Sequence, residues 1–183
     1  MWLLIFLAHI IGYWGTVMMM GSEWHAACAT RVLKNQFVYT PLVAWALSDV
    51  PTLPAFPHLA WQLVAAVIFT DILFYPLHRL AHTKYLYRFH AMHHEFHTPI
   101  PMAALYAGPV EHVVVNLVPP MVAGIVCRMD TLTFMAWAFA ASVNTVWAHA
   151  VPNQHTDHHR LRKKNYGVGF MLMDRWMGTL ATS

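Results

Sequence analysis

Charged side chains are scarce in this chain of 183 residues. Only 10% of the residues are Asp, Glu, Lys or Arg, whereas 58% are hydrophobic. Soluble domains carry more charge than this, so the balance indicates a single domain that resides in a lipid bilayer. The formal net charge is +3, but the basic residues lie beside apolar segments and not along a polar stripe, which argues against a nucleic-acid partner.

Cysteine and cofactor-binding motifs are also lacking. Cys28 and Cys127 form neither a CxxC pair nor a disulfide framework, and a structural zinc site usually needs cysteine ligands. The sequence contains no Gly-rich phosphate loop, no GxSxG elbow and no flavin or nicotinamide motif. An oxidoreductase with this sequence would therefore take its electrons from an external donor.

The sequence does contain four long apolar stretches. Each approaches the roughly 20 residues that a helix needs to cross hydrocarbon. A shorter run, Phe37 to Leu47, contains Pro41 and cannot span at about 1.5 Å per residue, so we expect an interfacial or re-entrant segment there. The four long stretches are Met1 to Met20, Leu59 to Pro76, His112 to Cys127 and Leu132 to His149.

These stretches predict an all-α integral membrane protein with about four transmembrane helices. The first stretch lacks the basic flank of a secretory signal, which favours an anchor helix over a cleaved peptide. We expect two parts: an N-terminal anchor helix with the interfacial segment at residues 1–58, and a second domain at residues 59–183.

Histidine is abundant, with fourteen residues against eight acidic ones. Histidine is the commonest metal ligand in proteins. In a helix, positions i, i+3 and i+4 share one face, so HxxxH and HxxHH motifs direct several imidazoles to one region. One ion takes about three to five protein ligands, so nine such imidazoles predict two ions. The candidate ligands are His78 and His82, then His90, His93 and His94, then His149 at the end of the fourth stretch, and finally His155, His158 and His159.

The other histidines have more ordinary interpretations. A single histidine on a helix is usually packed or solvated, and this is our expectation for His9, His25 and His58. His97 and His112 lie close to the second cluster in sequence. They are candidates for further ligands or for groups that support the ligands.

Two acidic residues are candidates for orienting the ligands. Asp71 precedes His78 by two helical turns, so both lie on the same helix face. We expect the Asp71 carboxylate to orient a ligand imidazole, with a hydrogen bond to Asn116 or Asn144 as the alternative. Asp157, inside the third cluster, is a second candidate, with a solvated position as its alternative.

All three clusters are expected at one face of the membrane. The third and fourth apolar stretches are joined only by Arg128-Met129-Asp130, so they form a hairpin that returns the chain to the side it left. The histidine face also carries most of the basic residues, and the positive-inside rule places it in the cytoplasm. These residues are Arg79, Lys84, Arg88, Arg160, Arg162, Lys163, Lys164 and Arg175.

The order HxxxH, HxxHH, HxxHH at the ends of membrane helices resembles the fatty acid hydroxylase/sterol desaturase superfamily of membrane di-iron oxygenases. The similarity extends from about Phe69 to Thr179 and is greatest to the C4-methylsterol monooxygenase-like branch, which includes the fatty acid hydroxylase domain-containing proteins. One departure is Gly108, where that branch usually has histidine. Either this position is not an obligate ligand, or His112 replaces it. The motifs beyond the histidines are Asp71 to Arg79, Ala104 to His112, Asn165-Tyr166-Gly167 and Asp174 to Thr179.

The resemblance implies two iron ions on the nine histidines, with zinc able to substitute, and O2 as co-substrate. It implies oxidation of a C–H bond in a sterol methyl group or a fatty acyl chain taken from the bilayer. Cytochrome b5 or a similar donor would supply electrons, and in a eukaryote the protein would reside in the endoplasmic reticulum. Asn165 and Asp174 are expected to lock the C-terminal segment to the clusters. A desaturase on the same scaffold, a histidine-rich metal transporter or storage protein, and a catalytically silent relative remain alternatives.

Overall fold

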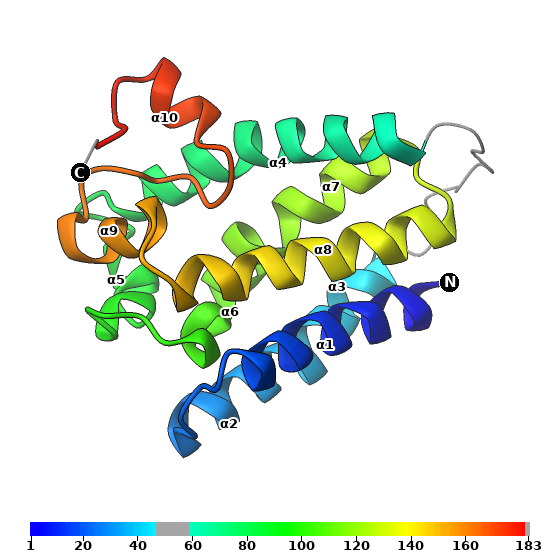
Figure 1. The fold of residues 1–183 in the computed structure, drawn as a ribbon, viewed down its shortest axis with the longest axis horizontal. Helices are drawn as coiled ribbons and strands as arrows, with labels where there is room; N and C mark the ends of the chain where they lie inside the picture. Colours follow the sequence, from blue (N-terminus) through cyan, green and yellow to red (C-terminus); the bar gives the residue numbers. More distant parts are fainter. Residues whose placement is uncertain (47–58, 182–183) are drawn as a thin grey trace.

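The computed structural model describes residues 1–46 and 59–181. Within these ranges the chain is helical and contains no strand. The long helices lie side by side in a bundle, and the short helices α5, α9 and α10 gather at one end of it (Figure 1). The α-helices are α1 (Trp2–Met19), α2 (Ala26–Lys34), α3 (Thr40–Ala46), α4 (Leu59–Ala81), α5 (Tyr87–His90), α6 (Pro109–Glu111), α7 (Val118–Val126), α8 (Thr131–Ala150), α9 (Gln154–Leu161) and α10 (Leu172–Trp176).

Short 3₁₀ and π segments complete the described chain. The 3₁₀ helices η2 (His93–Glu95) and η3 (Pro101–Leu105) lie between α5 and α6. The π-helical segments η1 (Asn35–Tyr39) and η4 (His112–Leu117) join α2 to α3 and α6 to α7. Helical structure is therefore continuous from Pro109 to Val126.

Three described helices are long and apolar enough to cross a membrane: Trp2–Met19, Ala60–Ala81 and Pro109–Val126. These helices make the chain a membrane protein. The fourth expected span forms α8, which is long enough at 20 residues. Its threonines, together with Ser142, Asn144 and His149, make it less apolar, so the structure supports three spans by composition where about four were expected.

The segment after α1 is helical over a longer range than the apolar run Phe37 to Leu47, and its interfacial or re-entrant placement stays a prediction. Helical structure runs without a break from Ala26 through η1 to Ala46, antiparallel to α1 (Figure 1). The first half of this run contains charged residues, so it does not stand out as an apolar stretch in the sequence. His25 caps its start by accepting a hydrogen bond from the Cys28 amide at 3.2 Å. Its buried face packs against η3. Leu47, the last residue of the expected segment, lies outside the described residues. The boundary expected after residue 58 also falls at the edge of the undescribed range 47–58, so the two-part division stays a prediction.

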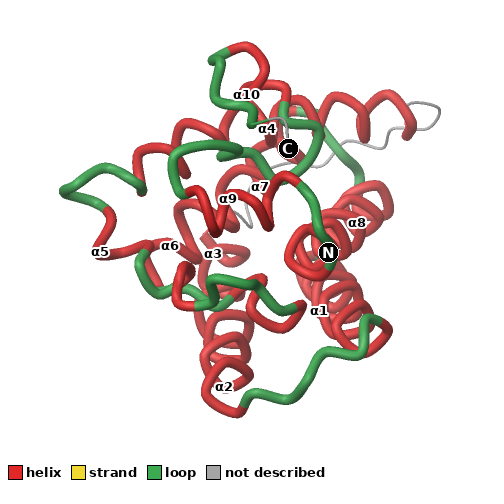
Figure 2. Tube along the Cα trace, turned by 60° about the vertical axis from the view of Figure 1, so that its left-hand side comes forward, coloured by secondary structure: helices red, strands yellow, loops and turns green. Residues whose placement is uncertain are grey.

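The expected hairpin between the third and fourth apolar stretches is present. Arg128 has a positive φ of 53°, and the Asp130 side chain accepts hydrogen bonds from the amides of Leu132 and Thr133 at the start of α8. Helix α8 then returns along α1 to the end of the bundle that holds α9 (Figure 2). Close contact with α1 needs Gly12, because an added Cβ would lie 2.8 Å from a backbone oxygen of α8.

Candidate metal centre

Nine histidines come together at the end of the bundle where α4 and α8 finish. They form two groups, and within each group one ring nitrogen of every residue lies within 4.8 Å of the others. The nine are the residues that the spacing singled out. The five-histidine group contains His78, His82, His90, His94 and His158, and the four-histidine group contains His93, His149, His155 and His159.

The five-histidine group has its Nε2 atoms turned towards a common centre. Nε2 of His82 lies 3.0 Å from that of His90, 3.2 Å from that of His94 and 2.9 Å from that of His158. The Nε2 atoms of His78 and His90 are 3.1 Å apart. Two ligands held about 2.1 Å from one ion at a right angle would be about 3.0 Å apart. The observed spacings match that value.

The four-histidine group is buried and more open. The Nε2 atoms of His149 and His93 are 3.4 Å apart, which is close to the roughly 3.4 Å edge of a tetrahedron with bonds of about 2.1 Å. Nε2 of His155 and Nε2 of His159 are buried and have no hydrogen-bond partner among the described residues. Buried polar atoms are normally satisfied, so these nitrogens fit a metal ion.

Backbone carbonyls fix the tautomer of most of these rings. A carbonyl oxygen only accepts, so the Nδ1 atom facing it carries the proton and Nε2 keeps its lone pair for a metal. The Nδ1 donors and their acceptors are His78 to Tyr166 O at 2.6 Å, His149 to Thr145 O at 2.7 Å, His155 to Gly167 O at 3.0 Å, His158 to Lys164 O at 2.7 Å, and His159 to Phe96 O at 3.2 Å.

A single buried carboxylate, that of Asp174, supports one ligand in the five-histidine group and one in the four-histidine group. Asp174 Oδ1 accepts from the Tyr166 amide at 2.9 Å, and Oδ2 accepts from the Gly167 amide at 2.6 Å. The carbonyl oxygens of these two residues accept the hydrogen bonds from Nδ1 of His78 and Nδ1 of His155. As expected, Asp174 locks the C-terminal segment to the clusters. Asn165 accepts from the Ala181 amide at 2.7 Å, a bond within the C-terminal segment, so its link to the clusters stays a prediction.

The sequence reasoning missed Glu111 at the end of α6. Its side chain is 2% exposed, and its Oε1 atom accepts a hydrogen bond from His90 Nδ1 at 2.7 Å. The same oxygen is 3.9 Å from Nδ1 of His93, which belongs to the other group. Carboxylate support of ligand imidazoles is common in metal sites. The available signal was a single acid directly before the apolar stretch that begins at His112.

The ring environment keeps these histidines neutral. Burial lowers the pKa of His90 to about 2 and that of His94 to about 3, with further lowering by neighbouring histidines. Burial and the nearby Arg162 guanidinium lower the pKa of His82 to about 4. Burial also lowers the pKa of His155 to about 4. Neutral imidazole is the form that binds a metal, so the site needs no deprotonation at neutral pH.

Asp71 has a different hydrogen-bond partner from the one expected. Its Oδ2 atom accepts a hydrogen bond from the Met173 amide at 2.8 Å, so it holds the start of α10, and it forms no hydrogen bond to a ligand imidazole within the described residues. Neither alternative partner bonds to it: Asn144 donates to Val168 O at 2.8 Å, and Asn116 Nδ2 has no partner among the described residues. Shared helix face alone could not show that the C-terminal segment would fold over this carboxylate.

His97, His112 and Asp157 also lie outside both histidine groups. His97 is exposed and accepts from Arg162 at 3.2 Å. Nε2 of His112 is 3.1 Å from Thr40 Oγ1, inside the bundle. His112 therefore does not replace the histidine absent at residue 108, and the nine imidazoles assemble without one there. Asp157 pairs with the exposed Arg160 side chain and contacts no imidazole of the groups.

His9 and His25 were expected to be packed or solvated, and neither belongs to a histidine group. Nδ1 of His9 is 2.7 Å from Ser142 Oγ inside the bundle. His25 caps α2. His58 lies outside the described residues.

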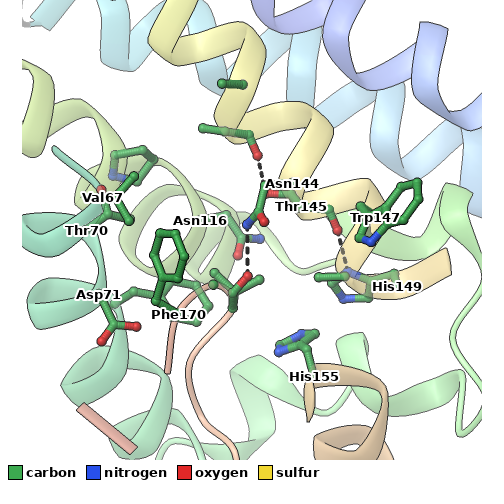
Figure 3. Close-up of a pocket in the computed structure, with 18 of the residues that line it drawn as sticks. Val67, Thr70, Asp71, Asn116, Asn144, Thr145, Trp147, His149, His155 and Phe170 are labelled. Carbon is green, nitrogen blue, oxygen red and sulfur yellow. Dashed lines mark hydrogen bonds between the residues drawn. The ribbon is translucent and has the colours of Figure 1, made fainter. Parts of the chain in front are cut away.

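An apolar cavity of about 470 Å³ adjoins the four-histidine group. His93, His149 and His155 form part of its wall, and η3, η4, α4, α7, α8 and the segment before α10 also contribute to it. Figure 3 shows His149 and His155 on one side of the lining and Thr70, Asp71 and Phe170 on the other. Volumes of about 300–1,000 Å³ are typical of small-molecule sites.

Fold and site together define a class of membrane protein: an apolar helical bundle that gathers histidines at one end beside an apolar cavity. The sequence profile named Fatty acid hydroxylase matches residues 63–179. The chain belongs to this family, and its resemblance to the methylsterol monooxygenase branch is confirmed.

Three relatives illustrate the match. Fatty acid hydroxylase domain-containing protein 2 of Macaca fascicularis is 34% identical over 155 residues, covering 78% of this chain and 45% of the relative. Fatty acid hydroxylase ahd1 of Mycosarcoma maydis is 31% identical over 149 residues, covering 75% and 39%. Methylsterol monooxygenase 2-2 of Arabidopsis thaliana is 31% identical over 187 residues, covering 83% and 68%. The chain spans less than half of the first two relatives. No solved structure matches it.

Proposed function

We propose that this chain is a membrane di-iron oxygenase that hydroxylates a C–H bond of a lipid, with O2 as co-substrate. The observation that supports this most directly is the gathering of nine neutral imidazoles into groups of five and four beside an apolar cavity. Relatives named as methylsterol monooxygenase and fatty acid hydroxylase support the same reaction class. The oxidised group would be a methyl group of a sterol or a fatty acyl chain.

The residues present fit two metal ions, one in each histidine group. Their donor set is imidazole alone, which suits iron and also admits zinc. Iron bound there would supply the oxygen activation and C–H oxidation that no side chain of the protein can perform. The protein contributes ligand orientation through the Nδ1 hydrogen bonds, chiefly those organised by Asp174 and Glu111.

The cavity binds and orients the lipid. Its wall includes His93, His149 and His155 but no member of the five-histidine group, so a bound C–H faces the four-histidine group. Apolar residues such as Phe74 and Trp137 line the remaining wall, hold hydrocarbon and exclude water. Desaturation would begin at the same bond, and product analysis separates the two outcomes.

The histidine end of the bundle also fits contact with an electron donor. Arg160, Arg162, Lys163 and Lys164 follow the third histidine cluster, and the N-terminus lies at the opposite end of the bundle (Figure 1). We therefore propose that the histidine end faces the cytoplasm, in a eukaryote at the endoplasmic reticulum, and that an acidic donor of the cytochrome b5 type docks there.

Metal analysis of detergent-purified protein tests the proposal. We expect about two irons per chain, and about one after His158→Ala in the five-histidine group or His155→Ala in the four-histidine group. His97→Ala is the matched control, because His97 is exposed and lies in neither group, and it should retain both irons. Two zincs that iron replaces under anaerobic reconstitution would also agree.

Absence of bound metal after anaerobic iron reconstitution would overturn the proposal. Iron-loaded protein is then supplied with reductant, O2 and membrane lipids, and the lipids are analysed by mass spectrometry. An oxidised lipid that depends on both His158 and His155 supports the oxygenase. Full iron occupancy without O2 consumption or oxidised lipid would instead identify a catalytically silent relative.

A further inference from the structure

A stretch near the C-terminus, residues 168–177, crosses from α8 to α4 beside the histidine end of the bundle. We call it the C-terminal strap. The Asn144 side chain of α8 donates to Val168 O at 2.8 Å, and the Asp71 side chain of α4 accepts from the Met173 amide at 2.8 Å. The first four residues of the strap, which lie between these two hydrogen bonds, line the apolar cavity. The strap is therefore part of the cavity wall and is tied to a helix on either side.

The outer face of the C-terminal strap is apolar apart from one arginine. Asp174, the only acidic residue of the strap, is fully buried. Such a concentration of large apolar side chains on a surface indicates a partner other than water. The exposed side chains are those of Phe170 at 67%, Leu172, Trp176 at 79% and Met177, together with the charged Arg175.

The segment just before the strap has a different surface. It follows the third histidine cluster at the same end of the bundle, and three of its exposed side chains are basic. The exposed chemistry thus changes from basic to apolar within a few residues, as it does where a membrane protein passes from water into lipid. The exposed side chains of this preceding segment are those of Arg160, Leu161, Lys163 and Lys164.

The place of the strap along α4 favours the bilayer as its neighbour. Asp71 lies near the middle of Ala60–Ala81, which is long and apolar enough to cross a membrane, and ten residues or about 15 Å before its end. Tyr75 OH is 3.0 Å from Thr179 Oγ1, directly after the strap. Helix α10 accordingly packs beside the half of α4 nearer the histidine end (Figure 1). A bilayer that surrounds α4 would also reach the strap.

We propose that the outer face of the C-terminal strap inserts into the bilayer at the boundary between headgroups and hydrocarbon. Trp176 suits this level because an indole has an apolar body and one polar N–H, and Arg175 can extend its guanidinium to the headgroups. Asp71 and Asn144, polar side chains on two long apolar helices, then hold an inserted segment in place. Lipid and cavity face opposite sides of the strap. The proposal does not depend on the oxygenase function.

Spin labels on single cysteines test the insertion. The full chain is reconstituted in phosphatidylcholine vesicles after Cys28→Ala and Cys127→Ala, and a nitroxide is attached at Phe170→Cys or at Trp176→Cys. Electron paramagnetic resonance then measures collisions of the label with O2, which concentrates in hydrocarbon, and with a water-soluble nickel chelate. Both strap labels should collide more with O2 than with the chelate.

Two reference positions calibrate the collision ratio. Ile11→Cys is the lipid reference, because Ile11 is exposed on α1, a helix long and apolar enough to cross a membrane. Arg160→Cys is the water reference, because Arg160 is an exposed basic residue of α9. The ratio of O2 to nickel collisions at both strap labels should lie nearer the Ile11 value than the Arg160 value.

Brominated phosphatidylcholine provides a second measurement that needs no cysteine variant. Bromine atoms on the acyl chains quench tryptophan emission on contact, so Trp176→Phe should lower the fraction of the emission that brominated vesicles quench. Trp137→Phe is the matched control. Because Trp137 is buried in the bundle, its removal should leave the quenched fraction at or above the wild-type value.

Three results would overturn the insertion. One is a collision ratio at both strap labels that equals the Arg160 value, which would place the strap in water. Another is shelter of both labels from O2 and nickel alike, which would show the face packed against protein, such as a second copy of this chain. The third is an equal quenched fraction in wild type and Trp176→Phe, and this comparison decides alone if the cysteine variants fail to fold.

Discussion

Replacing Glu111 tests whether one buried carboxylate controls metal affinity at the five-histidine group. The Glu111 side chain is 2% exposed and accepts from His90 Nδ1 at 2.7 Å. Without that acceptor the His90 ring loses its orientation, and its Nε2 no longer stays about 3 Å from the Nε2 atoms of His82 and His94. Loss of such a supporting group typically lowers metal affinity 10–100-fold, about 1.4–2.7 kcal/mol.

Two substitutions separate the contributions of charge and of hydrogen bonding. Glu111→Gln keeps a carbonyl oxygen that can accept from His90, so we expect about a tenfold loss of affinity. Glu111→Leu removes the acceptor, so we expect a loss nearer 100-fold, confined to one of the two irons. The second iron should be retained more firmly, because Oε1 is 3.9 Å from Nδ1 of His93 and makes no hydrogen bond to it.

The assay is competition for iron with a chelator of known affinity, read as irons per chain against free metal concentration. Glu95→Gln is the matched control, since Glu95 is an exposed carboxylate that accepts from the Tyr106 hydroxyl and from no ligand imidazole among the described residues. Thermal unfolding of the metal-free variants checks that the fold is intact. The reasoning is refuted if Glu111→Leu binds both irons with wild-type affinity, or if Glu95→Gln loses as much as Glu111→Gln.

Further predictions concern the hydrogen bonds of Asp174 to the C-terminal segment, the pH dependence of stability, and His112. Gly167→Ala places a Cβ 3.0 Å from Asp174 Oδ2, so it should displace the lock and lower both the unfolding temperature and the iron content; unchanged values would contradict the lock. Burial lowers the pKa of His82 to about 4 and that of His94 to about 3, below the value of about 6.5 in an unfolded chain. Below pH 6.5 the unfolded chain of the metal-free protein thus binds more protons, so stability should fall progressively from about pH 6.5 towards pH 4; a flat unfolding midpoint across that window would be inconsistent. His112→Leu should keep two irons, as measured by metal analysis, and loss of one would place this histidine among the ligands.

The sequence by itself determined the properties that depend on neighbouring residues along the chain. Apolar runs of about 20 residues identified α1, α4 and the helical stretch that ends in α7, because spanning length and hydropathy are local. The three-residue link at Arg128 fixed the hairpin, and therefore the common location of the clusters. Helical spacing likewise selected all nine imidazoles that the structure brings together.

Only the tertiary structure decided how those imidazoles are divided. Each HxxHH motif contributes to both groups: His93 separates from His90 and His94, and His158 separates from its own neighbours. Spacing places these side chains on one side of a short helix, but it cannot show which of them faces which partner helix. The division depends on how α4, α8 and α9 meet.

The partners of Glu111 and Asp71 could not be read from the sequence. Glu111 contacts His90 across 21 residues, and Asp71 contacts Met173 across 102. A carboxylate in an apolar segment must find a partner, but its own sequence gives no information on which distant segment supplies one. Tertiary packing supplies both donors: His90 lies beside Glu111, and the C-terminal segment, which lies over α4, brings the Met173 amide to Asp71.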